Sequence, residues 1–512
     1  MDLLQLLDNV DVLEVHGTRA REIEGICFDS RRCEADFLFV AVAGMKSDGH
    51  LFVPEAVRRG AKAIVYEKEI ARHASYTSIR VRDSRRALGV LGKNFFENPS
   101  GALGLIGVTG TNGKTTVTYL LESILREAGC EPGVIGTVNY RWGETVLAAS
   151  HTTPESFELQ RLLAGIRDAG VTHVVMEVSS HALELRRVED CEFDLGIFMN
   201  LTQDHLDFHG TMEDYFASKK RFFTDLLAGE KNGRRQGRII NVDDPWGRRL
   251  AEELRPATGI VTFGIDSIAF IQAKEVQLGL GEIRAEIETP AGAFPIRAPL
   301  SGRFNLSNIL AATAAAFHLG IPLSAIQRGI EIARPVPGRL EKISEMGEPA
   351  VFVDYAHSED ALRRVLQNLA QFRKGRVITV FGCGGDRDRG KRPLMGRAAA
   401  EQSDLVIITS DNPRTEEPLA IIGAIEGGID AGVMKKVSPD ALRTAGPGKA
   451  YTVVADRRQA IGLAIDLANE EDIVLVAGKG HEDYQILGTN TIPFDDRTVG
   501  REALDRKRGS AG

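Results

Sequence analysis

The segment that most constrains the fold of this chain is an apolar strand that runs into a glycine-containing loop and then into a helix. Residues 103–108 form the apolar run, residues 109–116 form the loop, and residues 114–128 have the pattern of a helix that ends near Gly129. Glycine lets backbone N–H groups approach phosphate oxygens, and the N-terminal end of a helix carries partial positive charge. The segment therefore predicts a phosphate-binding loop at the carboxyl end of a buried strand.

The loop residues have the chemistry of a nucleoside triphosphate site. Lys114 would reach the outer phosphates, and the Thr115 hydroxyl would ligate magnesium. The general pattern has a further glycine at the position of Val108, so we expect a variant loop. A glycine-rich turn without a ligand is the alternative, and the Gly-Lys-Thr-Thr sequence at a helix start argues against it. The ATP contacts expected from the loop are Gly110, Thr111, Asn112, Gly113, Lys114, Thr115 and Thr116.

The rest of the chain alternates short apolar runs with amphipathic stretches, which is typical of parallel sheets covered by helices on both faces. At 512 residues the chain exceeds the roughly 250–300 residues that one core supports. Turn-forming sequences at residues 98–101 and 335–339 divide it. We predict an α/β protein of three domains: residues 1–98, a central domain at residues 99–336 with a P-loop-type parallel sheet, and a Rossmann-like α/β domain at residues 337–512.

Two shorter segments carry their own predictions. Residues 268–298 alternate in short β runs, which indicates a small antiparallel insertion. Residues 506–512 are small and basic, and we expect a mobile tail.

Composition excludes several classes of partner. The formal net charge is −8, which argues against a broad basic face for nucleic acid. The N-terminus lacks the features of a signal peptide, and no apolar run approaches the roughly 18–20 residues that span a bilayer. The five cysteines show no metal-ligand spacing, so we expect reduced thiols. These features favour a cytoplasmic protein without membrane insertion or nucleic-acid partners, and we expect a monomer.

Two further side chains follow strands expected in the central domain. Glu177 lies in the apolar run at residues 174–178, and His205 follows the run at residues 195–199. Residues at the carboxyl ends of parallel strands converge on one crevice. Each side chain alone is equally compatible with a structural hydrogen bond, but the phosphate loop favours metal ligands.

Longer motifs resemble those of a known family. They are Gly-Thr-Asn-Gly-Lys-Thr-Thr at residues 110–116, Met-Glu-Val-Ser-Ser-His at 176–181, Asn-Leu-Thr-Gln-Asp-His-Leu-Asp-Phe-His-Gly at 200–210 and Asp-Tyr-Ala-His at 354–357. Together they resemble the Mur ligases, over nearly the whole chain. The resemblance implies that ATP phosphorylates the terminal carboxylate of a UDP-linked muramoyl peptide. An incoming amine then attacks the acyl phosphate, and phosphate leaves.

The resemblance also implies roles for individual residues. Lys114, His205 and Lys219 would be catalytic, and Lys219 stands where the family carries a carbamylated lysine. Magnesium would be bound by Thr115, Glu177, His205 and Lys219. Further ATP contacts would be Asn305, Arg339, Asp354 and His357. The UDP-N-acetylmuramoyl dipeptide would contact Phe28, Ser30, Met45, Lys46, Ser47, Thr152, Thr153, Ser179, Leu185 and Arg187, although the family often has glutamine in place of Leu185.

The Asp-Asn-Pro-Arg sequence at residues 411–414 bears on which amino acid is added. In the family this motif marks members that add meso-diaminopimelate, and lysine-adding members usually lack the arginine. Diaminopimelate ends in a second ammonium–carboxylate head, and a guanidinium can bind a carboxylate through two parallel hydrogen bonds. A solvated loop arginine is the alternative. The expected amino-acid contacts are Arg387, Asp411, Asn412, Pro413, Arg414, Gly478 and Glu482.

Three other functions stay open at this point: a lysine-adding ligase, a folylpolyglutamate-type synthetase, and a nucleotide-regulated binding protein without ligase chemistry. Arg414 argues against the first, and the Asp29-Ser30-Arg31 sequence argues against the second. The third would not need the residues assigned to diaminopimelate.

Overall fold

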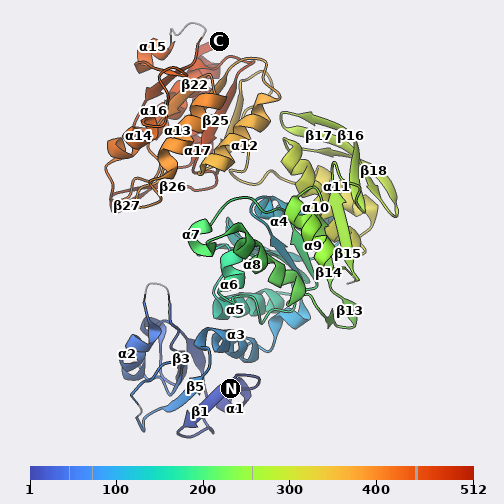
Figure 1. Cartoon of the computed structure of the whole chain (residues 1–512), viewed down its shortest axis with the longest axis vertical. Coiled ribbons are helices and arrows are strands. Elements are labelled where there is room, and N and C mark those ends of the chain that lie inside the picture. The colour runs from blue at the N-terminus through green and yellow to red at the C-terminus, as the bar shows by residue number, and fades with distance from the viewer. Residues whose placement is uncertain (45–46, 72, 256–257, 444–447, 512) are drawn as a thin grey trace. The chain divides into compact units, whose positions relative to one another are not determined.

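The computed structural model describes residues 1–44, 47–71, 73–255, 258–443 and 448–511. Within these residues the larger sheets have five, eleven and seven strands, in that order along the chain (Figure 1). The chain clusters into two compact units. Unit 1 comprises Met1–Lys274, Ile287–Phe294 and Ser307–Ile330, and unit 2 comprises Glu275–Glu286, Pro295–Leu306 and Glu331–Gly512.

The first sheet has the order β1-β5-β4-β3-β2, and all neighbours are parallel except β1 and β5. Its alternating residues enter two cores, so that Leu38 and Val40 lie in one core and Phe39 lies in the other. This alternation is what a strand buried on both faces requires. The elements are α1 (Leu3–Leu6), β1 (Val12–His16), β2 (Gly25–Cys27), β3 (Phe37–Val40), α2 (Val53–Arg58), β4 (Ala63–Tyr66), β5 (Thr77–Val81) and α3 (Ser84–Phe95).

The central sheet is built around β6 (Gly104–Thr109), which is parallel to its neighbours β10 (His173–Glu177) and β11 (Leu195–Phe198). Residues 105–109 are all buried, so both faces of the strand are covered. The helix that follows the phosphate loop is α4 (Lys114–Glu127). The sheet also contains β7 (Pro132–Ile135), β8 (Asn139–Trp142), β9 (Thr145–Ala148), β14 (Gly237–Asn241) and β15 (Ile260–Gly264), and the helices are α5 (Ser156–Asp168), α6 (Ser180–Glu184), α7 (Leu206–His209), α8 (Met212–Thr224), α9 (Pro245–Glu253) and α11 (Leu323–Glu331).

The segment expected to be a small insertion continues this sheet. Its strands are β16 (Ile271–Gly279), β17 (Glu282–Thr289) and β18 (Gly292–Ala298), and β16 pairs with β15 in parallel. Two-residue connections join the three strands, which are consecutive neighbours in the sheet order. The β runs were therefore correctly predicted, but they extend the central sheet. The alanine-rich helix α10 (Arg303–His318) follows.

The third sheet has the order β19-β20-β25-β21-β22-β24-β23 and is parallel except between β19 and β20. Phe352 packs with residues of α12, α13 and α14, whereas Val351 and Val353 pack with residues of α16 and α17. Helices therefore cover both faces, as a Rossmann-like domain requires. The elements are β19 (Glu341–Lys342), β20 (Ala350–Asp354), α12 (Glu359–Ala370), β21 (Val377–Phe381), α13 (Lys391–Gln402), β22 (Leu405–Ile408), α14 (Pro418–Glu426), β23 (Lys435–Lys436), α15 (Pro439–Arg443), β24 (Ala450–Val453), α16 (Arg457–Leu467), β25 (Ile473–Ala477) and α17 (Asp496–Ala511).

The basic tail was predicted wrongly, because residues 506–511 continue helix α17. Lys507 donates hydrogen bonds to the backbone oxygens of Ile465, at 2.6 Å, and Asp466, at 3.2 Å, near the end of α16. A lysine at a helix C-terminus satisfies carbonyl groups that have no partner within the helix. The α/β fold class is confirmed, and the domain boundaries near residues 98 and 336 stay a prediction.

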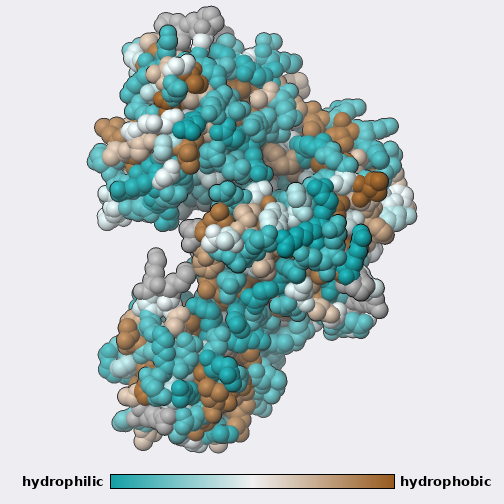
Figure 2. Space-filling view, viewed as in Figure 1, coloured by the Kyte–Doolittle hydropathy of each residue, from teal (hydrophilic) through white to brown (hydrophobic). Residues whose placement is uncertain are grey.

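The visible surface is mostly hydrophilic, with apolar side chains scattered singly or in small groups (Figure 2). Within the described residues, no helix combines the length and apolar character needed to cross a bilayer. All five cysteines are free.

Candidate active site

The phosphate loop has the backbone geometry that its two glycines allow. Gly110 has φ +150° and Gly113 has φ +89°, and the second conformation favours glycine. A Cβ at Gly113 would lie 2.4 Å from Oδ1 of Asn308, so a side chain there would collide with α10. Sequence reasoning missed Asn308. The signal in the sequence was a second asparagine, one turn after Asn305, in an otherwise alanine-rich helix.

Hydrogen bonds within the loop and to Asn200 fix the conformation of the loop. Lys114 Nζ donates to the backbone oxygens of Gly110, at 2.9 Å, and Thr111, at 3.0 Å. The Asn112 backbone N–H donates to Oδ1 of Asn200 at 2.9 Å. The lysine ammonium therefore lies over the loop, where the outer phosphates of a nucleotide would be bound.

Glu177 joins the loop to the end of β10. Its side chain is 1% exposed, and Oε1 accepts hydrogen bonds from the Thr115 hydroxyl at 3.0 Å and the Thr137 N–H at 2.9 Å. The Thr137 hydroxyl lies 3.1 Å from Oε2. A Cβ at Gly136 would lie 2.6 Å from Oε1, which explains glycine there. The structure thus brings Thr115 and Glu177 together as predicted, and adds Thr137, which sequence reasoning missed.

Lys219 is buried beneath the same loop. Its Nζ lies 3.2 Å from the backbone oxygen of Gly110 and 4.7 Å from the centre of the Tyr215 ring. Burial, and then the nearby Lys114 charge, lower the pKa of the Lys219 amine well below its ordinary value. Burial therefore makes this amine easier to deprotonate than an exposed lysine.

His205 lies on the loop before α7, with φ +54°. Its Nε2 is 3.5 Å from Oδ2 of Asp204, and its ring centre is 4.8 Å from that of His181 and 6.3 Å from that of Tyr215. Tyr215 also contacts Lys219, so His205 belongs to the same neighbourhood. Within the described part of the chain, no group of three or more His, Cys, Asp or Glu side chains is arranged to hold a metal ion. A metal here would need the Thr115 hydroxyl as well.

The residues assigned to the sugar and peptide of the substrate cluster beside Glu177. The Thr153 hydroxyl donates to the backbone oxygen of Glu177 at 2.8 Å and accepts from the Ser179 N–H at 3.1 Å. Arg187 donates to the backbone oxygen of Thr153 at 3.0 Å, and the Thr152 hydroxyl lies 3.1 Å from that of Thr137. Leu185 follows α6 directly, at the end of the same segment.

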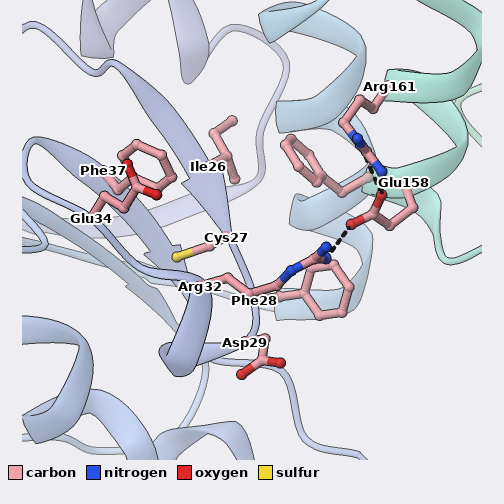
Figure 3. A pocket seen from close by; sticks show the side chains of 10 residues that line it. Ile26, Cys27, Phe28, Asp29, Arg32, Glu34, Phe37, Glu158 and Arg161 are labelled. Atoms are coloured by element: carbon pink, nitrogen blue, oxygen red, sulfur yellow. Dashed lines mark hydrogen bonds and ion pairs between the residues drawn. The ribbon is translucent and has the colours of Figure 1, made fainter. Parts of the chain in front are cut away.

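A pocket of about 340 Å³ lies in unit 1 between the first sheet and α5 (Figure 3). Phe28 is the predicted substrate contact that lines it, and Arg32 and Arg161 pair with Glu158 at its edge. Ser30 is buried in the short 3-10 helix Ser30–Arg32. Ser47 accepts a hydrogen bond of 3.0 Å from the Gly44 N–H through its backbone oxygen. Met45 and Lys46 lie outside the described residues.

Three of the further residues that are predicted to contact ATP come together in unit 2. Asp354 ends β20, and its carboxylate accepts hydrogen bonds from the N–H groups of Leu340, at 2.6 Å, and Ala356, at 2.8 Å. Burial raises the pKa of the Asp354 carboxyl, and the Arg339 charge opposes that shift. The Arg339 guanidinium lies 4.7 Å from the Tyr355 ring centre, and the His357 ring lies 4.6 Å from the same ring. Asn305, also in unit 2, donates to the backbone oxygen of Ser301 at 2.9 Å.

Two arginines that are predicted to contact the amino acid, Arg414 and Arg387, lie beside Gly384 in unit 2. Arg414 has φ +51°, and its Nη1 donates to the backbone oxygen of Gly385 at 2.7 Å. A Cβ at Gly384 would lie 3.0 Å from Arg414 Nη1 and 3.7 Å from Arg387 Cγ. The side chains of both arginines therefore pass the same glycine.

The remaining residues that are predicted to contact the amino acid lie close to one another in the same loops. Asn412 Nδ2 donates to Oε2 of Glu482 at 2.9 Å. A Cβ at Gly478 would lie 2.6 Å from Oδ2 of Asp411, so the backbone of the loop after β25 packs directly on that carboxylate. The backbone oxygen of Pro413 comes so close to Gly385 that a Cβ there would overlap it. The structure thus brings together all seven residues that the motif singled out.

Family models match the chain in three consecutive stretches. They are "Mur ligase family, catalytic domain" at residues 22–96, "Mur ligase middle domain" at residues 108–316, and "Mur ligase, glutamate ligase domain" at residues 338–480.

Relatives of known activity match over the whole length. A UDP-N-acetylmuramoyl-L-alanyl-D-glutamate–2,6-diaminopimelate ligase of Geobacter metallireducens is 47% identical over 497 residues, which is 97% of each chain. The protein of the same name from Geobacter sulfurreducens is 46% identical and covers 100% of this chain and 99% of its own. A solved structure of a ligase with that name has a TM-score of 0.70 at 30% identity and covers 99% of each chain.

Proposed function

The chain belongs to the Mur ligase family, and we propose that it uses ATP to add meso-diaminopimelate to the D-glutamate of UDP-N-acetylmuramoyl-L-alanyl-D-glutamate. The identity of 47% over 97% of both chains, to a ligase named for this activity, supports the substrate pair. The product is a precursor of peptidoglycan. We further propose a cytoplasmic monomer with domain boundaries near residues 98 and 336.

The chemistry explains why ATP is needed. A carboxylate is a poor electrophile, and transfer of the γ-phosphoryl group to it creates an acyl phosphate with a good leaving group. The amine of diaminopimelate then attacks the acyl carbon and forms the C–N bond. The C–O bond to the phosphate breaks, phosphate departs, and the nitrogen loses one proton. Lys114, which here donates to two loop carbonyls, would turn to the outer phosphates, and the N–H groups at the start of α4 would bind phosphate oxygens.

The donors around Glu177 fit magnesium, which prefers oxygen ligands. The carboxylate is almost fully buried, and within the described residues its hydrogen bonds come only from neutral groups, namely Thr115 and Thr137. A buried charge without a cation is unfavourable, so a cation is expected beside it. Magnesium bound there would offset phosphate charge during transfer. Thr115, Glu177 and His205 would hold it, together with a modified Lys219.

We propose that Lys219 is carbamylated. Its neutral amine would attack carbon dioxide, forming an N–C bond and a carboxylate while the nitrogen loses one proton. Burial favours the neutral amine that this step needs. The resulting anion would lie near the Lys114 charge, which lowers the pKa of the unmodified amine and would attract a carbamate instead.

The observation that carries the choice of amino acid is the arrangement of charges in unit 2. The side chains of Arg414 and Arg387 both pass Gly384, and the Asp411 and Glu482 carboxylates lie in the same set of loops. Two cations and two carboxylates complement an ammonium–carboxylate head. Lysine lacks the second carboxylate, so this arrangement favours diaminopimelate.

ADP release tests the proposal with the full-length protein. We expect release that requires ATP, magnesium, UDP-N-acetylmuramoyl-L-alanyl-D-glutamate and meso-diaminopimelate together, with far less when lysine replaces diaminopimelate. Release at the same rate without either substrate would indicate a nucleotide-hydrolysing protein of another function. Equal rates with lysine would contradict the choice of amino acid alone.

A further inference from the structure

A buried lysine without a role in the proposed mechanism lies among the amino-acid contacts. Lys479 follows β25, and its side chain is 0% exposed. Gly478 and Gly480 on either side have φ +117° and +55°, conformations that L side chains rarely adopt. The Gly-Lys-Gly sequence therefore turns the chain sharply, with the lysine side chain directed into the domain.

The ammonium group of Lys479 contacts several of the proposed substrate contacts at once. It donates to Oδ1 of Asn412 at 3.1 Å and to Oε2 of Glu482 at 3.1 Å. It also lies 3.8 Å from Oδ1 of Asp411. Because Lys479 is fully buried, any effect that it has on a bound ligand would pass through the side chains that it contacts.

Lys479 is one of three partners that together give the Asn412 amide a single allowed orientation. Oδ1 accepts from the lysine ammonium and from the Ile486 N–H at 3.0 Å, and Nδ2 donates to the Glu482 carboxylate. An ammonium and a backbone N–H only donate, and a carboxylate only accepts. A flipped amide would therefore lose three hydrogen bonds, and the lysine supplies one of these constraints.

Lys479 also compensates the charge of the two carboxylates. Arg457, another fully buried cation of this domain, forms hydrogen bonds of 2.8 and 2.6 Å with Asp496. Lys479 is left to pair with Asp411 and Glu482. Both hydrogen bonds that Glu482 accepts from Lys479 and Asn412 go to Oε2, and within the described residues no side chain or N–H donates to Oε1.

We infer that Lys479 is a positioning residue for the amino-acid substrate, which fixes Asn412 and Glu482 so that Oε1 of Glu482 is available to the ammonium group of that substrate. The inference rests on the proposed function, because it assumes that this group of residues binds the incoming amino acid. It predicts an effect confined to that substrate, whereas a structural role would change stability or all substrates alike.

Steady-state kinetics of the full chain, with KM measured separately for the three substrates, tests the inference. Lys479→Met should raise KM for diaminopimelate about tenfold or more, the effect of losing a charge-assisted hydrogen bond, and leave KM for ATP and the UDP substrate nearly unchanged. Lys479→Arg keeps the charge but not the single nitrogen between two acceptors, so a smaller rise is expected. Lys507→Met, which removes a lysine that donates to backbone oxygens at the C-terminal end of α16 and to that of Ala468, should lower the melting temperature without changing KM for diaminopimelate.

A double-mutant cycle tests whether Lys479 acts through Glu482. Lys479→Met and Glu482→Gln should each raise KM for diaminopimelate. The KM of the double variant should not exceed that of the single variant with the higher KM. The double variant also removes the half-buried Glu482 carboxylate that Lys479→Met leaves without its cation, so it serves if Lys479→Met alone does not fold. If neither folds, Lys479→Arg decides, and an unchanged KM for diaminopimelate overturns the inference. The inference is also overturned if the fold increases in KM for diaminopimelate of the two single variants multiply in the double variant. Equal increases in all three KM values overturn it as well.

Arg414→Ala separates this inference from the proposed function. If Arg414→Ala raises KM for diaminopimelate and a folded Lys479→Met does not, the positioning role is wrong and the substrate assignment stands. If the unaltered protein shows no release of ADP that depends on diaminopimelate, the proposed function itself fails.

Discussion

The Thr115 hydroxyl donates a hydrogen bond of 3.0 Å to the Glu177 carboxylate, and this bond joins the first turn of α4 to the end of β10. Thr137 donates to both oxygens of the same carboxylate. A buried negative charge is thus fixed beside the loop that we propose binds the phosphates of ATP.

Glu177→Gln tests that charge. The substitution keeps the size of the side chain, removes the negative charge, and turns one acceptor toward Thr115 or Thr137 into a donor. We expect the magnesium concentration needed for half-maximal ADP release to rise about 10–100-fold. Glu253→Gln is the control, because Glu253 forms surface pairs with Lys220 and Arg249, away from the loop. The same magnesium dependence in both variants would show that Glu177 does not bind the ion.

Removal of carbon dioxide tests the modification of Lys219. Because burial favours the neutral amine, the carbamate should form at neutral pH and dissociate slowly in degassed buffer that lacks bicarbonate. Activity should fall under those conditions and return when bicarbonate is added. ¹³C NMR with labelled bicarbonate should show one carbamate signal that is absent from Lys219→Met. An activity that is indifferent to bicarbonate, with no such signal, would contradict the modification.

Arg414→Ala tests the proposed contact with the second carboxylate of diaminopimelate. The loss of a guanidinium–carboxylate pair should raise KM for diaminopimelate about 10–100-fold and leave KM for ATP within a factor of about two. Arg364→Ala is a matched control, because Arg364 forms an exposed pair with Asp360 on α12. Equal changes for ATP and diaminopimelate would argue against a direct contact.

The lowered pKa of His481 predicts how the free energy of unfolding depends on pH. Burial, with further contributions from Arg339 and Arg497, lowers the pKa of the His481 imidazole to about 4 from an ordinary value of 6.5. The unfolded chain therefore binds a proton more readily than the folded chain between pH 6.5 and 4. Stability from this group is fully present above pH 6.5 and is lost as the pH falls toward 4, by up to about 3 kcal/mol. His481→Gln should flatten the fall in melting temperature across that window, and an unchanged slope would refute the assignment.

The strand and helix pattern could be predicted from the sequence because local burial determines it. The predicted apolar run at residues 103–108 is β6, which begins and ends one residue later, and the predicted helix at residues 114–128 is α4, which ends one residue earlier. Motif residues such as Arg414 and Glu482 could also be assigned to one group. The helical state of residues 506–511 could not be predicted, because it depends on long-range contacts such as that of Lys507 with α16.

The residues that the sequence did not reveal act through contacts between distant segments. Asn308 lies against Gly113, and Thr137 bonds to Glu177, although neither belongs to a short motif. Lys479 stands within a recognised stretch, but its burial is visible only in the folded domain. A single sequence shows which residue types are present, and it does not show which of them lose contact with water.

The most direct test of the account is to identify the product that the protein makes from an equimolar mixture of meso-diaminopimelate, lysine and ornithine. The mixture would also contain ATP, magnesium and UDP-N-acetylmuramoyl-L-alanyl-D-glutamate, and mass spectrometry would follow the UDP-linked products. We predict a UDP-linked tripeptide that carries diaminopimelate, formed together with one ADP per product. A tripeptide that carries mainly lysine, or ADP formed without any tripeptide, would contradict the account.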